Sequence, residues 1–282
     1  MELFIAWGAS RYKYNTILST VSALIDWCIS KGAPRDSLTC SAVTRLLKTV
    51  KAEQGPAGLP FGKTGMSKDL LGKLLTHVAV EAKSRPTFAP LLFRDSAWLV
   101  LEFFGLLRRS ELVALRMSDD VLTGTGTTSF ITVRIRHSKT DRQRAGVDVL
   151  ITGHTCGGWD LTSKVARFQK LRLLAGAGPE DPFLVGWDLD TLRLKKEGLA
   201  NGEALASRLR KHLQDLLQIH PDLVVNPQSY GMHSLRRGGV LAAWQAGVDV
   251  EKIRVHGKWK SDAVRAYMTA GRDIKLAVTS VM

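Results

Sequence analysis

The sequence predicts a mainly α protein with a small antiparallel β-sheet, divided into a helical domain and an α+β domain. Apolar residues recur at helical spacing in most segments, and the spacing changes to an alternation of two only near residues 131–151. A Gly- and Pro-rich stretch, QGPAGLPFGKTG at 54–65, has the composition of a linker. A chain of 282 residues can form one large domain or two smaller ones, and we predict domains at 1–62 and 63–282.

Two amphipathic helices are expected in the first domain. One begins near Asn15, a residue that can cap it, and ends before Gly32. The second begins near Ser41 and places basic residues opposite its apolar face. That face is either simply solvated or follows a phosphate backbone, and the sequence favours neither. The basic residues are Arg45, Lys48 and Lys51.

The second domain opens with a helix that Ser67 can cap. The segment from Ser96 to Phe104 is apolar nearly all round, which is typical of a buried helix. It leads into GLLRRSEL, where charged groups at the end of a buried helix are costly unless they are paired or used. Ser110 can cap the following helix, and Glu111 can hold a neighbouring arginine. A structural salt bridge is the simpler interpretation of this motif alone.

The alternating segments predict a hairpin. Ile131, Val133 and Ile135 alternate with polar residues, and a second alternation follows from Val147. The loop between them, HSKTDRQRAG, is basic and carries Lys139 near its start. A lysine at a hairpin tip is usually solvated. Helices are expected at 161–175 and 203–219, and the first of them carries Lys164 and Arg167.

The stretch from residue 233 to 267 contains the side chains best suited to chemistry. His233 and Arg236 are three residues apart, so they can share one helix face. Trp259 and Tyr267 follow in GKWKSDAVRAY. A guanidinium can hold charge on phosphoryl oxygens, an imidazole can move a proton, and a phenol can become a covalent nucleophile. Together they predict attack on a phosphodiester.

Charge and cysteine content narrow the partners. Lys and Arg total 40 against 26 Asp and Glu, a net charge of +14, which favours nucleic acid, although a basic non-binding surface has the same composition. Cys28, Cys40 and Cys156 lack metal-ligand or disulfide spacing, which indicates a reducing interior. There is no apolar run long enough for a bilayer and no phosphate-binding glycine loop. We expect an intracellular protein without a zinc site, and the family resemblance described below implies a reaction that needs no metal and no cofactor.

The order of these motifs resembles the catalytic domain of the tyrosine recombinases, the phage integrase family. GLLRRSEL resembles its first-arginine motif, SKTD its hairpin lysine motif, HSLRRG its His and second Arg, and GKWKSDAVRAY its closing motif. The sequences SKTD and GKWKSDA most resemble the corresponding motifs in recombinases of DIRS- or crypton-type mobile elements. The resemblance covers about residue 66 to the end, and the N-terminal helices more loosely resemble the family's core-binding domain, which clasps the duplex. By this resemblance the catalytic residues are Arg108, Lys139, His233, Arg236, Trp259 and Tyr267, with Glu111 in support.

Three of the assigned catalytic positions have alternative candidate residues. Arg109 and Arg237 adjoin the two assigned arginines, although the motif register favours Arg108 and Arg236. His256 competes with Trp259 for the third position, at a longer spacing to Tyr267 than the family usually shows. The residues predicted to contact DNA are Arg45, Lys48, Lys51, Arg136, Lys164 and Arg167.

The resemblance implies a metal-independent reaction on double-stranded DNA. Tyr267 attacks the scissile phosphate to give a 3′-phosphotyrosyl link and a free 5′-hydroxyl, and Lys139 protonates the departing oxygen. Strand exchange would occur in a tetramer on two duplexes, in the nucleus of a eukaryote or the nucleoid of a bacterium. A type IB topoisomerase with a similar constellation and a DNA-binding descendant with a decayed site are the two rival interpretations.

Overall fold

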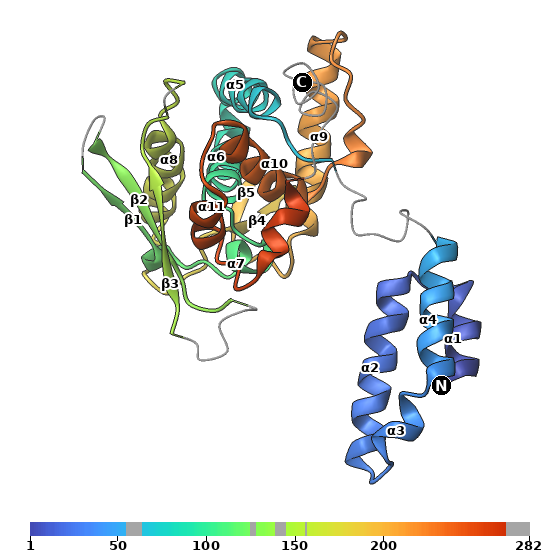
Figure 1. Cartoon of the computed structure of the whole chain (residues 1–282). Helices are drawn as coiled ribbons and strands as arrows, with labels where there is room; N and C mark the ends of the chain where they lie inside the picture. The colour runs from blue at the N-terminus through green and yellow to red at the C-terminus, as the bar shows by residue number, and fades with distance from the viewer. Residues whose placement is uncertain (55–63, 125–127, 139–144, 156, 269–282) are drawn as a thin grey trace. The chain divides into compact units, whose positions relative to one another are not determined.

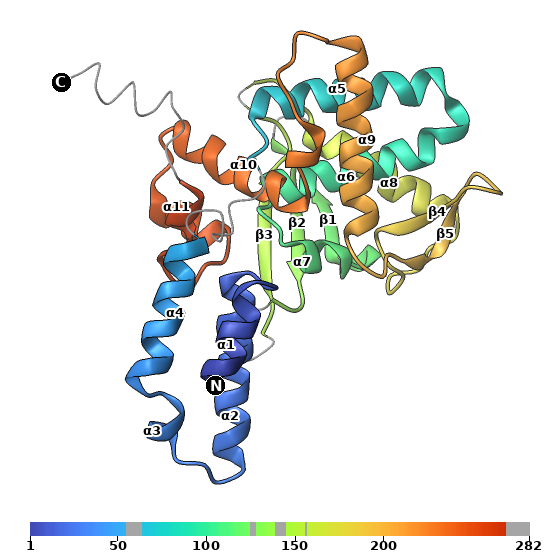
Figure 2. The same cartoon turned by 90° about the vertical axis from the view of Figure 1, so that its right-hand side faces the viewer.

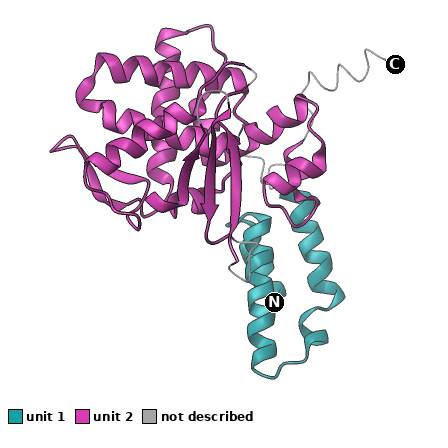
Figure 3. Cartoon of the chain, turned by 90° about the vertical axis from the view of Figure 1, so that its left-hand side faces the viewer, with its two compact units in different colours: residues 1–63 teal, residues 64–282 magenta. Residues whose placement is uncertain are grey.

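The computed structural model describes residues 1–54, 64–124, 128–138, 145–155 and 157–268 (Figure 1). The chain forms two compact units, Met1–Lys63 and Thr64–Met282 (Figure 3). The boundary predicted after residue 62 lies outside the described residues.

The first unit contains α1 (Glu2–Ala9), α2 (Tyr14–Ser30), α3 (Arg35–Leu38) and α4 (Ser41–Gln54). The prediction that Asn15 caps the first long helix is wrong, because α2 begins at Tyr14 after Lys13. Gln54 at the end of α4 supplies the missing polar contact, since its Oε1 accepts the Tyr14 backbone N–H at 2.7 Å. This contact depends on tertiary packing. The small core of the unit consists of Ile5, Ile17, Val21, Val43 and Val50.

The second unit is built around α6 (Ala89–Phe104), whose side chains are mostly buried as its apolar sequence predicts. It packs against α5 (Lys68–Ser84), α8 (Leu161–Leu174) and α10 (Met232–Gln245). Ser67 caps α5 as predicted, because its Oγ accepts the Leu70 N–H at 3.2 Å. A 3-10 turn, Pro86–Phe88, joins α5 to α6.

Two antiparallel sheets accompany these helices. The first has the order β1-β2-β3, from β1 (Asp120–Thr123), β2 (Phe130–Ile135) and β3 (Val147–Thr152), and the second pairs β4 (Val185–Asp188) with β5 (Arg193–Gly198). The predicted hairpin is β2–β3, and its register places Ile131 opposite Ile151 and Val133 opposite Val149. These four side chains are buried, which confirms the alternation. The mainly α fold with a small antiparallel sheet is therefore confirmed.

The remaining elements are short, apart from α9, and one of them carries Tyr267. They are α7 (Arg109–Val113), α9 (Glu203–Ile219), α11 (Val250–His256) and the 3-10 helices Met117–Asp119, Pro227–Ser229 and Asp262–Tyr267. Tyr267 thus ends a 3-10 helix. Figure 2 shows α9 crossing α5, against which it packs. Among the described helices, none is both long and apolar enough to span a membrane.

Two adjacent glycines let α10 approach the rest of the unit closely. A Cβ at Gly238 would overlap the carbonyl of Met66, and a Cβ at Gly239 would overlap the carbonyl of Phe103 at the end of α6. The glycines that follow the HSLRR sequence therefore set how deeply His233 and Arg236 are placed against α6.

Candidate active site

Arg108 and Glu111 form the salt bridge that the sequence predicts. Arg108 Nη1 lies 2.7 Å from Glu111 Oε1, and the Arg108 backbone N–H donates to Glu111 Oε2 at 2.9 Å. Glu111 therefore satisfies the start of α7. The expected cap by Ser110 is wrong, because the cap residue is Arg108, two positions earlier, and Ser110 lies inside the helix. Ser138, three residues beyond the end of β2, accepts from Arg108 Nη1 and donates to Glu111 Oε1, both at 2.9 Å. The pair is tied to the sheet.

Arg236 is buried and held by backbone carbonyls. Its side chain is 1% exposed, Nη1 donates to the carbonyl of Leu106, and Nη2 donates to that of Gly257 at 2.8 Å. Leu106 has a φ of 47°, a left-handed conformation that costs a non-glycine residue about 1–3 kcal/mol. Burial, together with the nearby positive charge of Arg108, lowers the pKa of Arg236 to about 10. It remains cationic at neutral pH.

Trp259 lies between Arg236 and Tyr267. The Arg236 guanidinium carbon is 4.0 Å from the centre of the indole ring, a cation–π contact, and the Trp259 and Tyr267 ring centres are 5.4 Å apart. Any side chain at Gly257 would collide with the indole. The glycine of the GKW motif thus allows Trp259 to lie against its own turn.

His233 is hydrogen-bonded to the tyrosine. Its Nε2 lies 2.9 Å from the Tyr267 hydroxyl, and the residue is exposed to solvent. Partial burial and the positive charges of Arg236 and Arg108 lower the pKa of His233. A neutral imidazole at this distance can accept the phenolic proton.

The two candidates for the third position lie in different surroundings. His256 Nε2 is hydrogen-bonded to the carbonyl of Phe104 at 2.8 Å, whereas Trp259 contacts both Arg236 and Tyr267. The neighbouring arginines also differ from the assigned pair, because Arg109 is exposed and Arg237 is only partly buried.

Lys258 is a site residue that the sequence analysis missed. Its Nζ lies 3.5 Å from Glu111 Oε2 and its side chain is 7% exposed. Burial, together with the charges of Arg236 and Arg108, lowers the pKa of Lys258 to about 8, although Glu111 acts in the opposite direction. The residue sits within GKWK beside Trp259, and only that adjacency could have drawn attention to it.

The other predicted residues are divided between the two units. Lys139 lies outside the described residues. Arg136 is ion-paired with Asp119 at 2.6 Å and with Glu180 at 3.4 Å. Lys164 and Arg167, both on α8, line a cavity of about 350 Å³, and burial lowers the pKa of Lys164. In the first unit the three basic residues of α4 are exposed: Arg45, Lys48 and Lys51.

Positive charge exceeds negative charge at this site. Lys258 and Arg108 lie beside the carboxylate of Glu111 and lower its pKa despite its burial, and Arg236 adds a third cation to the site. Glu102 is also near Arg236, but burial raises its pKa well above the usual value, so it favours the neutral acid. Such an arrangement suits an anion with distributed charge, such as a phosphodiester.

Known structures share this fold. A XerH site-specific recombinase bound to palindromic difH substrate, in a post-cleavage complex, matches with a TM-score of 0.53 and 16% identity over 83% of this chain. A Tn1549 transposon integrase in complex with circular intermediate DNA matches with a TM-score of 0.51 and 14% identity over 99% of this chain. The matches cover 57% of the XerH chain and 83% of the integrase chain. No family model and no curated protein sequence matches. Because the sequence identities are low, the matches show the fold alone, which is that of the tyrosine recombinases.

Proposed function

We propose that this protein is a site-specific DNA recombinase that cleaves and rejoins strands through a 3′-phosphotyrosyl intermediate on Tyr267. The contact between the Tyr267 hydroxyl and His233 Nε2, at 2.9 Å, carries the proposal. Tyr267 also packs against the indole of Trp259, which in turn stacks on the buried guanidinium of Arg236. A nucleophile, a base and a fixed cation are thereby brought together.

In the proposed cleavage step a bond forms between the Tyr267 oxygen and phosphorus while the bond to the 5′ oxygen breaks. His233 takes the phenolic proton, and Arg108 and Arg236 bind the non-bridging oxygens as negative charge develops. Two N–H groups of Arg236 are already directed at the Leu106 and Gly257 carbonyls, which fixes the plane of the guanidinium before DNA binds. Little reorganisation is then required in the transition state.

The departing 5′ oxygen needs a proton, and we assign this role to Lys139 from the family resemblance alone. Rejoining is the reverse reaction, in which a 5′-hydroxyl attacks the phosphotyrosyl bond and the proton returns to Tyr267. The bond energy is conserved in the intermediate, so the reaction requires no energy-rich cofactor, and the family resemblance implies that no metal takes part.

Double-stranded DNA is the proposed partner. The net charge of +14 supports it, as do the exposed cations of α4 and the basic residues on α8. We further propose that four protomers assemble on two duplexes and that the protein serves a mobile element, because the wording of SKTD and GKWKSDA favours that source.

The test uses a nicked suicide substrate carrying a candidate element end, incubated with the protein in EDTA and resolved on a denaturing gel. We expect a covalent protein–DNA band that is lost in Tyr267→Phe while DNA binding is retained. Tyr230→Phe is the matched control, because Tyr230 is a buried tyrosine of the same unit that lies outside the site. Its band should persist.

Two other results would contradict the proposal. Tight DNA binding without any covalent band would indicate a DNA-binding protein with an inactive site. Relaxation of supercoiled DNA without strand exchange between two duplexes would indicate a topoisomerase of type IB character.

A further inference from the structure

Four potential metal ligands from two helices converge away from the arginine and tyrosine residues. α5 supplies a histidine and a glutamate four residues apart, and α9 supplies a histidine and an aspartate three residues apart, so each pair shares one helix face. Their ligand atoms all lie within 4.8 Å of one another. We call this set the α5/α9 cluster, which consists of His77, Glu81, His212 and Asp215.

Both imidazoles of the cluster are buried with a nitrogen that lacks a partner. His212 is 0% exposed and His77 is 8% exposed. Among the residues that the structure describes, no hydrogen-bond partner reaches Nδ1 of His212 or Nε2 of His77. A buried polar atom without a partner is unfavourable, so these two nitrogens point to a ligand that compensates them.

The tautomer of His212 suits metal binding. Its Nε2 lies 2.9 Å from Oδ2 of Asp95, a carboxylate that can only accept, so we assign the proton to Nε2. Nδ1 then carries a lone pair. Arg208 Nη2 also lies 3.2 Å from Nε2, but Arg208 donates through Nε to Asp95 Oδ2 at 2.8 Å. A carboxylate behind a histidine is the usual support of a metal ligand.

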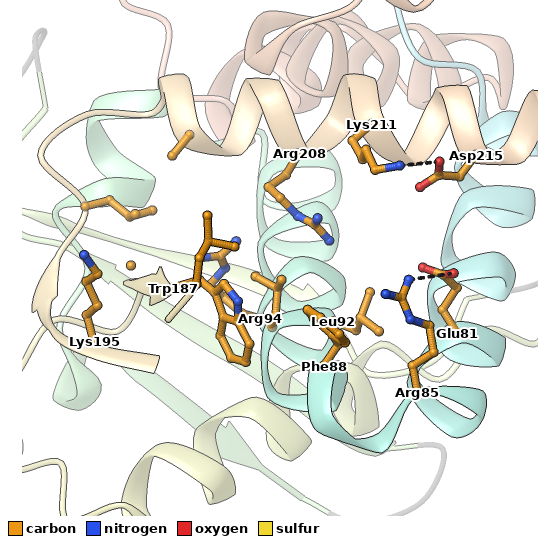
Figure 4. A pocket seen from close by; sticks show the side chains of 15 residues that line it. Glu81, Arg85, Phe88, Leu92, Arg94, Trp187, Lys195, Arg208, Lys211 and Asp215 are labelled. Atoms are coloured by element: carbon orange, nitrogen blue, oxygen red, sulfur yellow. Dashed lines mark hydrogen bonds and ion pairs between the residues drawn. The ribbon is translucent and has the colours of Figure 1, made fainter. Parts of the chain in front are cut away.

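The two carboxylates lie where an ion could enter. Glu81 and Asp215 line one end of a cavity of about 470 Å³, and Figure 4 shows their side chains projecting toward one another from α5 and α9. Each also pairs with a cation one helical turn away, Glu81 with Arg85 at 3.7 Å and Asp215 with Lys211 at 2.7 Å. Such partly exposed pairs are weak, so a divalent ion can displace them.

We propose that the α5/α9 cluster binds one divalent transition-metal ion, with Zn²⁺ as the best match, and that this ion ties α5 to α9. Two imidazoles and two carboxylates form a nitrogen and oxygen donor set that zinc accepts in a tetrahedral site. Bonds of about 2.0–2.2 Å separate tetrahedral ligand atoms by roughly 3.4 Å. The cluster must contract from its present spread, and the partly exposed carboxylates can rotate to do so.

Four protein ligands close such a site, so its role is structural. Sequence analysis predicts no metal site, because the two histidines are far apart in the chain and neither lies in a recognisable ligand motif. The ion is no part of the proposed strand cleavage. Calorimetry without DNA detects the ion, whereas the covalent band detects cleavage, so either proposal can fail while the other holds.

The test uses the full chain without a histidine tag, stripped with EDTA and then titrated with Zn²⁺ by calorimetry. We expect one equivalent to bind and to raise the thermal unfolding midpoint. Glu81→Gln combined with Asp215→Asn should weaken binding at least tenfold and abolish the thermal shift. The matched control is Asp69→Asn with Glu203→Gln, which removes the same charge from α5 and α9 outside the cluster and should bind like the unaltered chain.

Cobalt gives a measurement that does not depend on how well a variant folds. Co²⁺ added to the stripped, unaltered chain should produce the intense visible absorption of a tetrahedral nitrogen and oxygen site, and Zn²⁺ should remove it. The proposal is overturned by a weak octahedral spectrum, by the absence of saturable Zn²⁺ binding, or by equal binding to the Glu81→Gln, Asp215→Asn variant.

Discussion

Two buried polar clusters in the second unit solve the problem of burying charge in opposite ways. Asp95 accepts hydrogen bonds from Arg94, at 2.8 and 3.2 Å, from Trp98 at 3.2 Å and from Arg208 at 2.8 Å, in addition to the His212 contact. Arg236 instead donates to two neutral carbonyls and lies beside further cations.

The ionisation of the two groups reflects this difference. Burial alone would raise the pKa of Asp95, but Arg94, His212 and Arg208 outweigh it and hold the pKa well below the usual range. Arg236 has its pKa lowered by burial and by Arg108. The negative charge of Asp95 is balanced by the cations around it when the chain folds. The positive charge of Arg236 instead has another cation, Arg108, nearby. The first cluster stabilises the fold, and the second is suited to an anionic ligand.

The largest expected effect is on stability, at Asp95. Asp95→Asn should lower the free energy of unfolding by about 3–5 kcal/mol, because it removes the anion from a buried pair and leaves cations uncompensated. Urea unfolding measures the change. Asp148→Asn, which breaks an exposed pair with Arg134, should cost no more than about 1 kcal/mol. Similar losses in the two variants would contradict the structural role of Asp95.

The corresponding change in the second cluster should affect cleavage. Arg236→Lys keeps the charge but loses the planar group that contacts two carbonyls and the Trp259 ring. We expect single-turnover cleavage to fall by roughly 10²–10³, the effect of losing a transition-state contact worth about 2.7–4 kcal/mol. Arg193→Lys on β5 is the exposed control. Unchanged cleavage in Arg236→Lys would remove Arg236 from the mechanism.

Lys258 gives a pH signature with a definite sign. Its pKa is about 8 in the folded chain against an ordinary value of 10.5, so folding penalises its charged form. Below about pH 8, Lys258 is protonated in both the folded and the unfolded chain, so the full cost of burying its charge lowers the stability of the folded chain. Between about 8 and 10.5 the unfolded chain binds more protons, so folded stability rises with pH through this window, by about 1–3 kcal/mol. Chemical unfolding at several pH values should show this rise in the unaltered chain, and the slope should be absent from Lys258→Met.

The smallest effect is expected at Trp259. Trp259→Phe keeps an aromatic ring beside Arg236 but weakens the cation–π contact, which is worth about 0.5–2 kcal/mol. Cleavage should fall only a few-fold to about tenfold, with DNA affinity unchanged. A loss as large as that of Arg236→Lys would mean that the indole N–H donates directly to the reacting phosphate.

Local spacing determined the elements and the short-range contacts. The α4, α6, α8 and α9 helices, the alternation in β2 and β3 and the Arg108–Glu111 pair all follow from residues a few positions apart. Their spacing decides which face of an element is apolar and which groups can meet. The order of the motifs was likewise enough to predict the fold. The sequence analysis did not predict the short strands β1, β4 and β5 or the helix α1, because an element of so few residues is too short to show a clear periodicity.

Only the tertiary structure decided the long-range contacts. It placed Trp259 against Arg236 and His256 against the Phe104 carbonyl, brought Lys258 to Glu111, and set His77 near His212. Each of these contacts depends on a backbone carbonyl, a left-handed residue or a neighbouring helix contributed by a distant part of the chain. Periodicity describes one element at a time, so the sequence gives no such information until the elements have packed.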